Sequence, residues 1–402
     1  MNIWNIASKE NNMDSIQPRE QIKKLVITGD RNFFAQQRFS LLFDILASHI
    51  DTVERVPVEN LYDNKWLKKT AKRVIKHLPF PIKTAGKASA MRKNKASFIK
   101  QSQQCERQIR ALENTPDFVF HLFGMYSPFW DSFDIPFSMY LDYTMALAHQ
   151  TWQPWAPFAN EDDFLEWKEC ESIAYQKAAC IFTFSHLVKQ SLIEDYDVIP
   201  HKVFAVGASG QFSSPYAGKK TFGSDRILFN ASNFERKGGD LVIAAFQKIR
   251  AAIPTAELVI IGEKLSLPGH PGINNLGVVS GSGAMQQLFL DCDILLAPAL
   301  CEPYGQLLVE AINYGLPCVV SDIGGMPEII DHDVNGFVLS ELTPDCLADA
   351  VIDLLQDTSR LERYSKAGRQ KVEEQLNWGV IAEKMQAQIR ASAGLKQFSE
   401  KC

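Results

Sequence analysis

Two glutamates, Glu302 and Glu310, flank the start of an expected helix and carry the clearest chemical signal in the sequence. An apolar strand expected over residues 293–297 leads into this segment. The helix, expected over residues 306–314, ends at Gly315, which suits the left-handed conformation of a helix C-terminus. Unpaired N–H groups and a partial positive charge at a helix start suit a phosphate. A carboxylate one turn further on can accept two hydrogen bonds from a diol such as a ribose. The pattern predicts a site for a nucleotide that carries a polyol.

A simpler interpretation makes Glu302 and Glu310 ordinary surface residues of a helix and its cap, and for an isolated pair this is the commoner outcome. The neighbouring residues favour the binding site. Gly305 lets a ligand approach the backbone closely. Gln306 follows it, on the same helix face as Glu310.

The same stretch resembles the retaining glycosyltransferases of the GT-B fold, and glycosyltransferase family 4 in particular. Their signature is a glutamate, seven intervening residues and a second glutamate, with an aromatic–glycine step after the first. Here it is matched by Glu302, Tyr304, Gly305 and Glu310. The match continues through residues 315–317, 321–322, 324–330 and 335–336. The resemblance covers roughly residues 170–390 well and the first 170 residues weakly.

The resemblance implies an α/β protein of the GT-B class, with two doubly wound Rossmann-like domains facing across a cleft. We expect a flexible leader over residues 1–20 and an acceptor-side domain over residues 21–207. A nucleotide-sugar-binding domain is expected over residues 208–377, and a last helix over residues 378–395 should pack back on the first domain. A change in composition, rich in Gly, Ser and Pro, places the linker at residues 207–223.

Apolar runs of strand length support this architecture. In the second domain they alternate with amphipathic segments, which predicts a parallel sheet with helices on both faces. Ligands of such sheets bind at the C-terminal ends of the strands. The expected strands are residues 25–28, 118–123, 137–141, 180–184, 203–206, 226–231, 257–262, 293–297 and 318–321. The expected helices of the second domain include residues 239–251, 283–290 and 306–314.

The resemblance also assigns residues to a nucleotide-diphosphate sugar. Glu310 would bind the ribose, and Glu302 would position the transferred sugar near its anomeric carbon. The phosphates would meet the helix start, formed by Tyr304, Gly305, Gln306, Leu307 and Leu308. At the base end of the ligand we expect Glu263, which follows a strand, and Val279, in a segment that could cover the ring.

The diphosphate also needs cations, because the departing nucleoside diphosphate gains negative charge. In the family, the loop after the first strand of the second domain carries an arginine and, five residues later, a lysine. Lys237 matches the lysine, whereas Ser232 stands where the arginine is common. Arg236 is the candidate for the missing charge. The alternative is that Arg236 and Lys237 are solvated surface charges.

Asp142 is expected at the C-terminal end of the strand over residues 137–141. In many family members a His–Asp pair stands at this place, whereas here the sequence is Asp142-Tyr143. A carboxylate there could orient a sugar hydroxyl or stabilise positive charge at the anomeric carbon. His121 and His149 are rival candidates, although a lone histidine is more often a satisfied core residue. Asp142, Glu302 and Lys237 are thus the predicted catalytic residues, and the aromatic-rich residues 124–158 are the candidate acceptor wall.

The implied function is retaining transfer of a sugar from a nucleotide-diphosphate sugar to a glycan or lipid-linked acceptor, in cell-surface polysaccharide or glycolipid biosynthesis. No Asp-x-Asp metal motif stands where it would serve, so neither a metal nor a cofactor is predicted. Retention then suggests attack from the face that the leaving group departs from. Two alternatives stay open: a GT-B sugar-nucleotide epimerase, and a nucleotide-sugar or glycan-binding protein that has lost activity. A phosphorylase is disfavoured because no pyridoxal-lysine pattern is present.

Composition sets further limits. A net charge of −5 gives no general attraction to nucleic acid. Eight scattered cysteines without a CxxC pair favour a reducing cytoplasm. Residues 64–105 hold twelve Lys or Arg and no acid, with an amphipathic stretch at residues 67–78. This segment could lie on an anionic membrane surface as a peripheral contact. Equally, it could pack its apolar stripe on the domain and leave its basic face in solvent.

Overall fold

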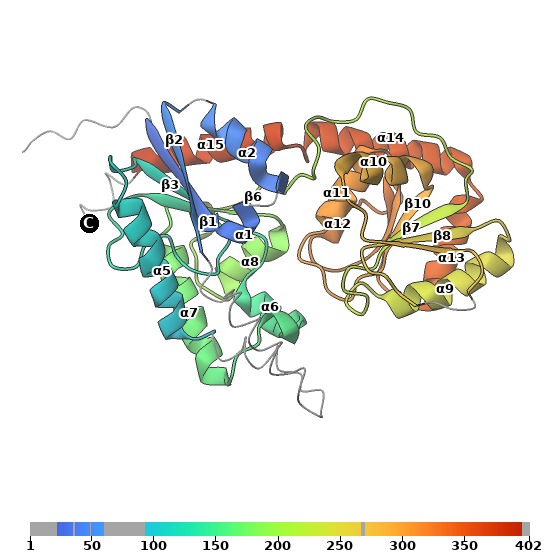
Figure 1. Ribbon diagram of the computed structural model, residues 1–402, viewed down its shortest axis with the longest axis horizontal. Coiled ribbons are helices and arrows are strands. Elements are labelled where there is room, and N and C mark those ends of the chain that lie inside the picture. Colours follow the sequence, from blue (N-terminus) through green and yellow to red (C-terminus); the bar gives the residue numbers. More distant parts are fainter. Residues whose placement is uncertain (1–21, 35–36, 49, 60–92, 267–269, 396–402) are drawn as a thin grey trace, which may run out of the picture.

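The computed structural model describes residues 22–34, 37–48, 50–59, 93–266 and 270–395. They form two lobes, each built around one sheet (Figure 1). Both sheets have six strands, and every strand pair is parallel. The predicted architecture of two doubly wound α/β domains is therefore confirmed. The proposed limit between residues 207 and 208 falls between the last strand of one sheet and the first strand of the other.

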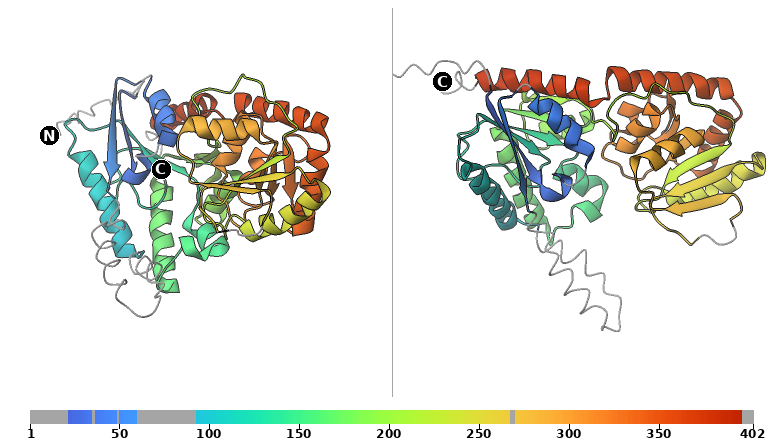
Figure 2. Two further views of the ribbon diagram at one scale, coloured as in Figure 1. Left: turned by 45° about the vertical axis from the view of Figure 1, so that its right-hand side comes forward. Right: turned by 45° about the horizontal axis from the view of Figure 1, so that its top comes forward.

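The first sheet has the order β2-β1-β3-β4-β5-β6. In that order its strands are Thr52–Val58, Lys24–Asp30, Phe118–Leu122, Phe137–Leu141, Cys180–Thr183 and Val203–Ala205. Strands β1, β3, β4 and β5 are buried along their whole length, as apolar strands covered by helices on both faces are expected to be. Helices α5 (Lys95–Arg110) and α7 (Glu161–Lys177) pack together on one face, and α2 (Ser40–Ala47) packs against α15 (Trp378–Leu395) on the other (Figures 1 and 2).

The second sheet has the order β12-β11-β10-β7-β8-β9. In that order its strands are Gly336–Leu339, Cys318–Ser321, Ile294–Ala297, Arg226–Asn230, Glu257–Ile261 and Ile273–Gly277. Helices α9 (Gly239–Ala252) and α13 (Pro344–Leu355) pack on one face, and α10 (Ser282–Asp291) and α11 (Gln306–Asn313) cover the other. The other α-helices of the described residues are α1 (Arg31–Phe34), α6 (Met145–Thr151), α8 (His186–Glu194), α12 (Met326–Ile329) and α14 (Thr358–Glu374). Three short 3-10 turns are η1 (Gln37–Phe39), η2 (Gln153–Trp155) and η3 (Pro200–Lys202).

Three strands had no expected counterpart in the sequence: β2, β9 and β12. All three lie at sheet edges. The sequence of β2, TVERVPV, includes Glu54, Arg55 and Pro57, and that of β9, INNLG, includes two asparagines. Edge strands tolerate such residues because one side of the ladder faces solvent, so apolar patterning is weak there. The remaining strands lie within two residues of their expected limits.

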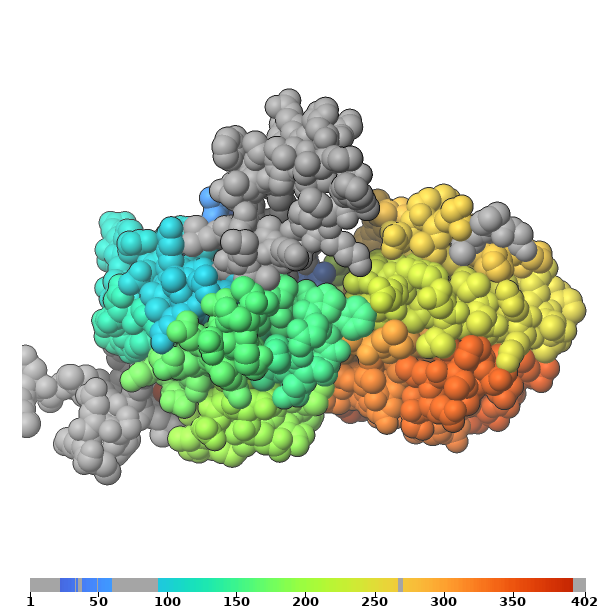
Figure 3. Space-filling view, turned by 90° about the horizontal axis from the view of Figure 1, so that it is seen from below, coloured from blue at the N-terminus to red at the C-terminus, as the bar shows by residue number. Residues whose placement is uncertain are grey.

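The last helix joins the two lobes. After α14 of the second lobe, α15 runs along the first lobe (Figure 1). Trp378, at its start, lies with its ring centroid 5.8 Å from that of Phe39, and Gln386 donates a hydrogen bond to the Ile45 carbonyl at 3.1 Å. Trp378 is almost fully buried. The chain thus ties its C-terminal helix into the first core, and the lobes meet as neighbouring bodies (Figure 3).

The basic segment, residues 64–105, for which membrane contact and packing on the domain were both left open, falls largely outside the described residues. The amphipathic stretch at residues 67–78 does so entirely. Its described part, residues 93–105, leads into α5, which Asn94 caps by accepting from the Ser97 N–H at 2.9 Å. Phe98 and Cys105 of this part are buried in the first lobe. None of the described helices is both long and apolar enough to cross a bilayer.

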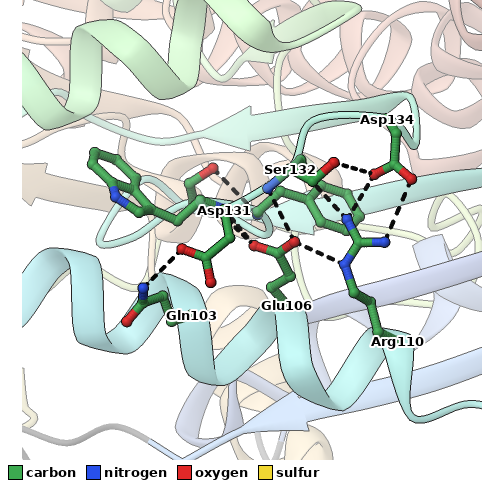
Figure 4. A network of polar contacts seen from close by, with 9 residues as sticks. Gln103, Glu106, Arg110, Asp131, Ser132 and Asp134 are labelled. Atoms are coloured by element: carbon green, nitrogen blue, oxygen red, sulfur yellow. Dashed lines mark hydrogen bonds and ion pairs between the residues drawn. The ribbon is translucent and has the colours of Figure 1, made fainter.

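A polar network fixes the loop between β3 and β4 onto α5 (Figure 4). The buried carboxylate of Glu106 accepts hydrogen bonds from the backbone N–H groups of Trp130, Asp131 and Ser132 at 2.8, 2.7 and 3.2 Å. It also pairs with Arg110 at 2.8 Å. Burial alone would raise the pKa of Glu106, but these hydrogen bonds outweigh it and hold the pKa below its usual range. One side chain therefore holds the start of the aromatic-rich segment.

Replacing Glu106 by alanine should lower the free energy of unfolding by about 2–4 kcal/mol, because three N–H groups lose their acceptor and Arg110 keeps only its contacts with Asp134 and Ser132. Glu106→Gln keeps one acceptor oxygen and should cost less. Because the folded pKa is depressed, this stabilisation is present above the unfolded pKa and is lost as pH falls through the folded value. Urea unfolding of both variants between pH 3 and 7 measures it. Equal stability of wild type and Glu106→Ala at pH 7 would contradict the role assigned to the network.

Candidate active site

The expected loop-to-helix stretch forms at the C-terminal end of β10, between Ala297 and α11. Gly305 precedes α11 with a φ of 98°, and Gly315 follows it with a φ of 74°, so both glycines occupy the left-handed region. A Cβ at Gly324 would lie only 1.7 Å from the Glu302 carbonyl oxygen. The glycine at 324 is therefore needed for a neighbouring loop to press against the backbone that presents Glu302.

The structure brings three predicted residues into one cluster, the Glu302 cluster, made of Glu302, Lys237 and Arg236. Lys237 Nζ lies 2.5 Å and Arg236 Nη1 3.1 Å from the same carboxylate oxygen, Glu302 Oε2. The three side chains are only 13%, 18% and 12% exposed, which is far from the solvated surface charge that was the alternative. Burial would raise the pKa of the Glu302 carboxyl, but the two cations outweigh it and hold that pKa below its usual range.

Local backbone chemistry explains how Lys237 and Arg236 reach this position. They lie in the turn that joins β7 to α9, where the Lys237 N–H bonds to the Asn233 carbonyl at 3.1 Å. Gly238 ends the turn with a φ of 72°, and a Cβ there would lie 2.1 Å from the Pro298 carbonyl oxygen. Only glycine therefore lets the turn pack this closely against the loop that follows β10. Strand β10 is the neighbour of β7 in the sheet.

Arg236 also reaches the first lobe. Its Nη1 donates to the Cys301 carbonyl at 2.5 Å, and its Cζ lies 4.9 Å from the centre of the Trp155 ring. A guanidinium over an aromatic face is an attractive contact. Arg236 therefore contacts both Glu302 and a tryptophan of the first lobe.

Glu310 and Gln306 share one face of α11, as expected, and both face the segment that leaves the first lobe. Glu310 accepts a hydrogen bond from the Gln211 N–H at 3.0 Å, and Gln306 Nε2 donates to the Ser209 carbonyl at 2.8 Å. A Cβ at Gly210 would lie 2.3 Å from Glu310 Cγ, so this approach requires glycine. Burial raises the pKa of Glu310, and the Gln211 N–H opposes the rise.

The residues assigned to the base, and Ser232, lie at neighbouring strand ends. Ser232, Glu263 and Val279 follow β7, β8 and β9, which are adjacent in the sheet. Ser232 and Glu263 are exposed, and Val279 is half-buried. Ser232 Oγ would lie 2.4 Å from a Cβ at Gly262. The structure places these three along one edge of the sheet, and their roles in binding stay predictions.

The helix start and two members of the Glu302 cluster, Glu302 and Lys237, line one narrow cavity at the same edge. Its walls are formed by residues of β7, β10 and the loops that follow them. Among them are Asn230, Lys237, Glu302, Gly305, Leu307 and Leu308. The predicted phosphate-binding residues thus converge on one space, although they come from segments about 65 residues apart in the chain. Tyr304, in contrast, is buried, with its ring centroid 5.6 Å from that of Phe184 of the first lobe.

Asp142 ends β4 and lines a second cavity, of about 210 Å³, which we call the interlobe cavity. Residues of the first lobe form nearly all of it, and Pro303 of the second lobe closes it. Burial raises the pKa of Asp142 to about 6; Arg38 and backbone N–H groups lower it, whereas Glu302 raises it further. The charge of Glu302, in the second lobe, therefore affects the pKa of Asp142, in the first lobe.

The interlobe cavity contains two charged residues that the sequence analysis did not identify, Lys93 and Glu171. Lys93 donates to the Trp155 carbonyl at 2.6 Å, and burial lowers its pKa to about 8 while Glu171 opposes this. Burial raises the pKa of Glu171 to about 7, although the Tyr196 hydroxyl at 2.5 Å and the Trp167 N–H at 3.2 Å both donate to it. Glu171 could have been predicted from the sequence, because it is a glutamate on the apolar face of α7.

The two rival histidines do not line the interlobe cavity. His121 is buried in β3 with its Nε2 3.0 Å from the Tyr126 carbonyl oxygen, and burial lowers its pKa to about 3. His149 stacks on Phe164 with ring centroids 3.9 Å apart. Both are packed residues, which was the commoner outcome expected for a lone histidine. Among the residues that the structure describes, no cluster of three or more His, Cys, Asp or Glu side chains could hold a metal ion.

The chain has two lobes, each with a parallel sheet and helices on both faces. The Glu302 cluster and the start of α11 lie in one lobe, and Asp142 lies at a strand end of the other. This arrangement is the GT-B class of fold. A solved structure supports this assignment of the fold: a protein of Anabaena in complex with UDP-glucose matches with a TM-score of 0.58. It is 14% identical, and the match covers 91% of this chain and 99% of that one.

Residues 217–371, which make up most of the second lobe, match the model of the family named glycosyl transferases group 1. A glycosyltransferase of Methanocaldococcus jannaschii, described as uncharacterized, is 35% identical over 166 residues, which are 39% of this chain and 42% of that protein. The GDP-mannose-dependent alpha-(1-6)-phosphatidylinositol monomannoside mannosyltransferase of Mycobacterium tuberculosis is 31% identical over 166 residues, 37% of this chain and 43% of that protein. The aligned segments thus span about two fifths of these relatives.

Proposed function

We propose that this protein is a retaining glycosyltransferase that moves a sugar from a nucleotide-diphosphate sugar to a glycan or lipid-linked acceptor. The observation that carries the proposal is the Glu302 cluster at the start of α11, opposite Asp142 of the first lobe. A diphosphate needs cations and free N–H groups, a sugar needs carboxylates, and this site combines them at the C-terminal edge of a parallel sheet.

In this proposal the diphosphate lies against the start of α11 and takes Lys237 and Arg236 as partners in place of Glu302. The Glu302 carboxylate is then released toward the transferred sugar. As the bond between the anomeric carbon and the diphosphate oxygen breaks, the two cations and the helix start stabilise the charge that develops on the leaving group. The acceptor oxygen bonds to the anomeric carbon from the same face, and its proton passes to the departing diphosphate. The chemistry is proposed to need no metal and no cofactor.

The interlobe cavity is the proposed place of the acceptor. It adjoins Asp142, contains Trp155 and Tyr143 as aromatic walls, and is closed by Pro303, which follows Glu302 in the chain. Aromatic faces suit sugar rings, and the nearby charged groups suit hydroxyls. Cell-surface polysaccharide or glycolipid biosynthesis remains the proposed setting. Contact with an anionic membrane surface through residues 64–105 is part of the same proposal.

The donor site can be tested by thermal unfolding with UDP-glucose, GDP-mannose and ADP-glucose. A ligand that binds only the folded state adds about 2.7 kcal/mol at 100 times its Kd, so one class of nucleotide should raise Tm by several degrees. Glu310→Ala should lose most of this shift, because the ribose loses its carboxylate. Glu373→Ala, which changes an exposed glutamate of α14, should keep it.

The outcome separates the proposal from its alternatives. A shift that is the same in wild type and Glu310→Ala would refute the assignment of Glu310. No shift with any of the three nucleotide sugars would count against the donor site as a whole. A shift without release of nucleoside diphosphate, across a panel of acceptors, would favour a protein that binds nucleotide sugars without transferring them.

A further inference from the structure

An arginine of the first lobe, Arg38, lies against the proposed donor site. It belongs to η1, the short turn that follows β1 and α1. Its Nη1 donates to Gln306 Oε1 at 3.0 Å, across 268 residues of sequence. Gln306 is the first residue of α11, whose start is the proposed phosphate site. The fold therefore brings a cation of one lobe to the helix start of the other.

Arg38 has hydrogen-bonding capacity that its surroundings leave unused. Its Nε–H is buried and has no hydrogen-bond partner within the part of the chain that the structure describes. No carboxylate of that part forms an ion pair with it, and its hydrogen-bond partner there is the neutral amide of Gln306. Leaving a buried donor of a charged group unpaired is costly, so such a group usually has a binding partner to serve.

The charge of Arg38 acts on both carboxylates that we assign to the two ends of the donor. Its charge acts on Asp142, proposed to face the reacting sugar, and on Glu310, proposed to bind the ribose. In a nucleotide-diphosphate sugar, the diphosphate joins the ribose to the sugar. A cation that acts on the groups assigned to both ends, and that bonds to the first residue of α11, is suitably placed for the diphosphate.

The second lobe leaves a need for such a cation. Ser232, where the family resemblance implies an arginine, is a neutral side chain that is exposed after β7. Lys237 and Arg236 both bind Glu302, and Arg236 also stacks on Trp155. A diphosphate that binds here competes with Glu302 for both cations, whereas Arg38 forms no ion pair with a carboxylate of the described residues.

We propose that Arg38 is a donor-binding residue that grips the diphosphate from the first lobe and supplies the cation that Ser232 does not. This inference rests on the proposed function. It also assigns a consequence to donor binding: one diphosphate is held by residues of both lobes, so its binding draws the lobes together. Bidentate arginine–phosphate contacts are strong and geometrically specific, and the free Nε–H offers the second arm of that fork alongside an Nη group.

The experiment measures binding of UDP, UMP and uridine, and of GDP, GMP and guanosine, by calorimetry to the full chain. Arg38→Gln should weaken the diphosphate that binds wild type by about 10- to 100-fold, as expected for a lost charged hydrogen bond. The matching nucleoside should bind as before. Arg38→Lys should recover part of the loss, and the salt dependence of diphosphate binding should be shallower in Arg38→Gln.

Two control variants separate charge from structure. Arg31→Gln changes an exposed arginine of the neighbouring α1, whose partner is Glu59 at 2.6 Å, and should leave all affinities unchanged. Gln306→Ala removes the contact between the lobes but keeps the guanidinium, so it should weaken diphosphate binding less than Arg38→Gln does. Equal losses in Arg38→Gln and Gln306→Ala would show that the contact matters and the cation does not, and would overturn the inference.

The remaining outcomes are also distinct. If wild type binds neither UDP nor GDP, nor ADP measured in the same way, the proposed function itself fails. If wild type binds one and Arg38→Gln binds it equally well, only the role of Arg38 is refuted. Should Arg38→Gln unfold, Arg38→Lys decides the question. If residue 38 binds phosphate, lysine should lower the affinity for the diphosphate only several-fold, and the salt dependence of binding should stay as in wild type.

Discussion

Replacing Glu302 by glutamine is expected to lower turnover by about 100-fold or more while leaving nucleoside diphosphate binding as strong as in wild type, or stronger. Turnover falls because the carboxylate that would position the transferred sugar is gone. Binding of the diphosphate rises because Lys237 and Arg236 no longer have a carboxylate partner, which a phosphate would otherwise have to displace. An effect of opposite sign on binding and on turnover is unusual, and it follows directly from the shared oxygen Glu302 Oε2.

The same variant should be less stable, by on the order of 1–3 kcal/mol, since two largely buried cations lose the charge that pairs with them. Added UDP or GDP should restore more Tm to Glu302→Gln than to wild type. The matched control is Glu257→Gln, which breaks the Arg226–Glu257 pair (2.8 Å) near the N-terminal ends of β7 and β8, at the opposite edge of the sheet. It should change neither turnover nor diphosphate affinity. Unchanged turnover in Glu302→Gln, or weaker diphosphate binding, would contradict the mechanism proposed for the Glu302 cluster.

The sequence predicted the centre of this site well because its signals are local. The apolar run and the two glycines that flank the helix each determine the backbone conformation of residues close to them in the sequence. The structure confirms the strand, the helix and the left-handed glycine at 315, and it shows that Gly305 is left-handed as well. The motif spacing then fixes Glu302 before the helix and Glu310 one turn into it. Such features depend on backbone preferences rather than on the order of strands in a sheet.

Contacts that depend on strand order could not be predicted in the same way. Glu302 meets Lys237 because β10 lies beside β7, which brings together the loops that follow these strands. A parallel sheet could be expected from the alternation of strands and helices, but the neighbour of each strand could not. Contacts between the lobes are harder still to predict from the sequence. Arg236 contacts Trp155, and Arg38 contacts Gln306, only because the two lobes are placed against each other.

Charged residues buried on apolar faces form a third group. Glu171 lies on the inner face of α7 and Lys93 before the start of α5, and both line the interlobe cavity with Asp142. A sequence pattern counts such residues as breaks in an apolar stripe or as part of a basic run, so the strand and helix assignments succeed while the site residues pass unnoticed. Burial is what shifts their pKa values, to about 7 for Glu171 and about 8 for Lys93, and burial is a property of the assembled lobe.

Asp142 provides the second large effect, because its carboxyl has a pKa of about 6, within reach of a rate measurement. If the ionised carboxylate stabilises positive charge at the anomeric carbon, kcat should be low below pH 6, rise through it and level off above pH 7. Asp142→Asn cannot ionise, so its kcat should be about 100-fold lower at pH 8 and should lose this acidic limb. Asp131→Asn, at an exposed aspartate of the same lobe, should keep the wild-type profile.

A stability measurement separates this role from a structural one. The pKa of Asp142 is raised in the folded protein, so the folded state holds its proton more tightly and the ionised carboxylate becomes a cost to stability as pH rises through 6. Asp142→Asn removes that cost and should unfold at the same or a higher temperature than wild type at pH 8. A variant that is inactive yet no less stable places Asp142 in the reaction itself. A wild-type profile that is flat between pH 5 and 8, or a variant that loses activity only by unfolding, would instead make Asp142 a residue of the fold, and the charge that faces the reacting sugar would then have to come from Glu302 alone.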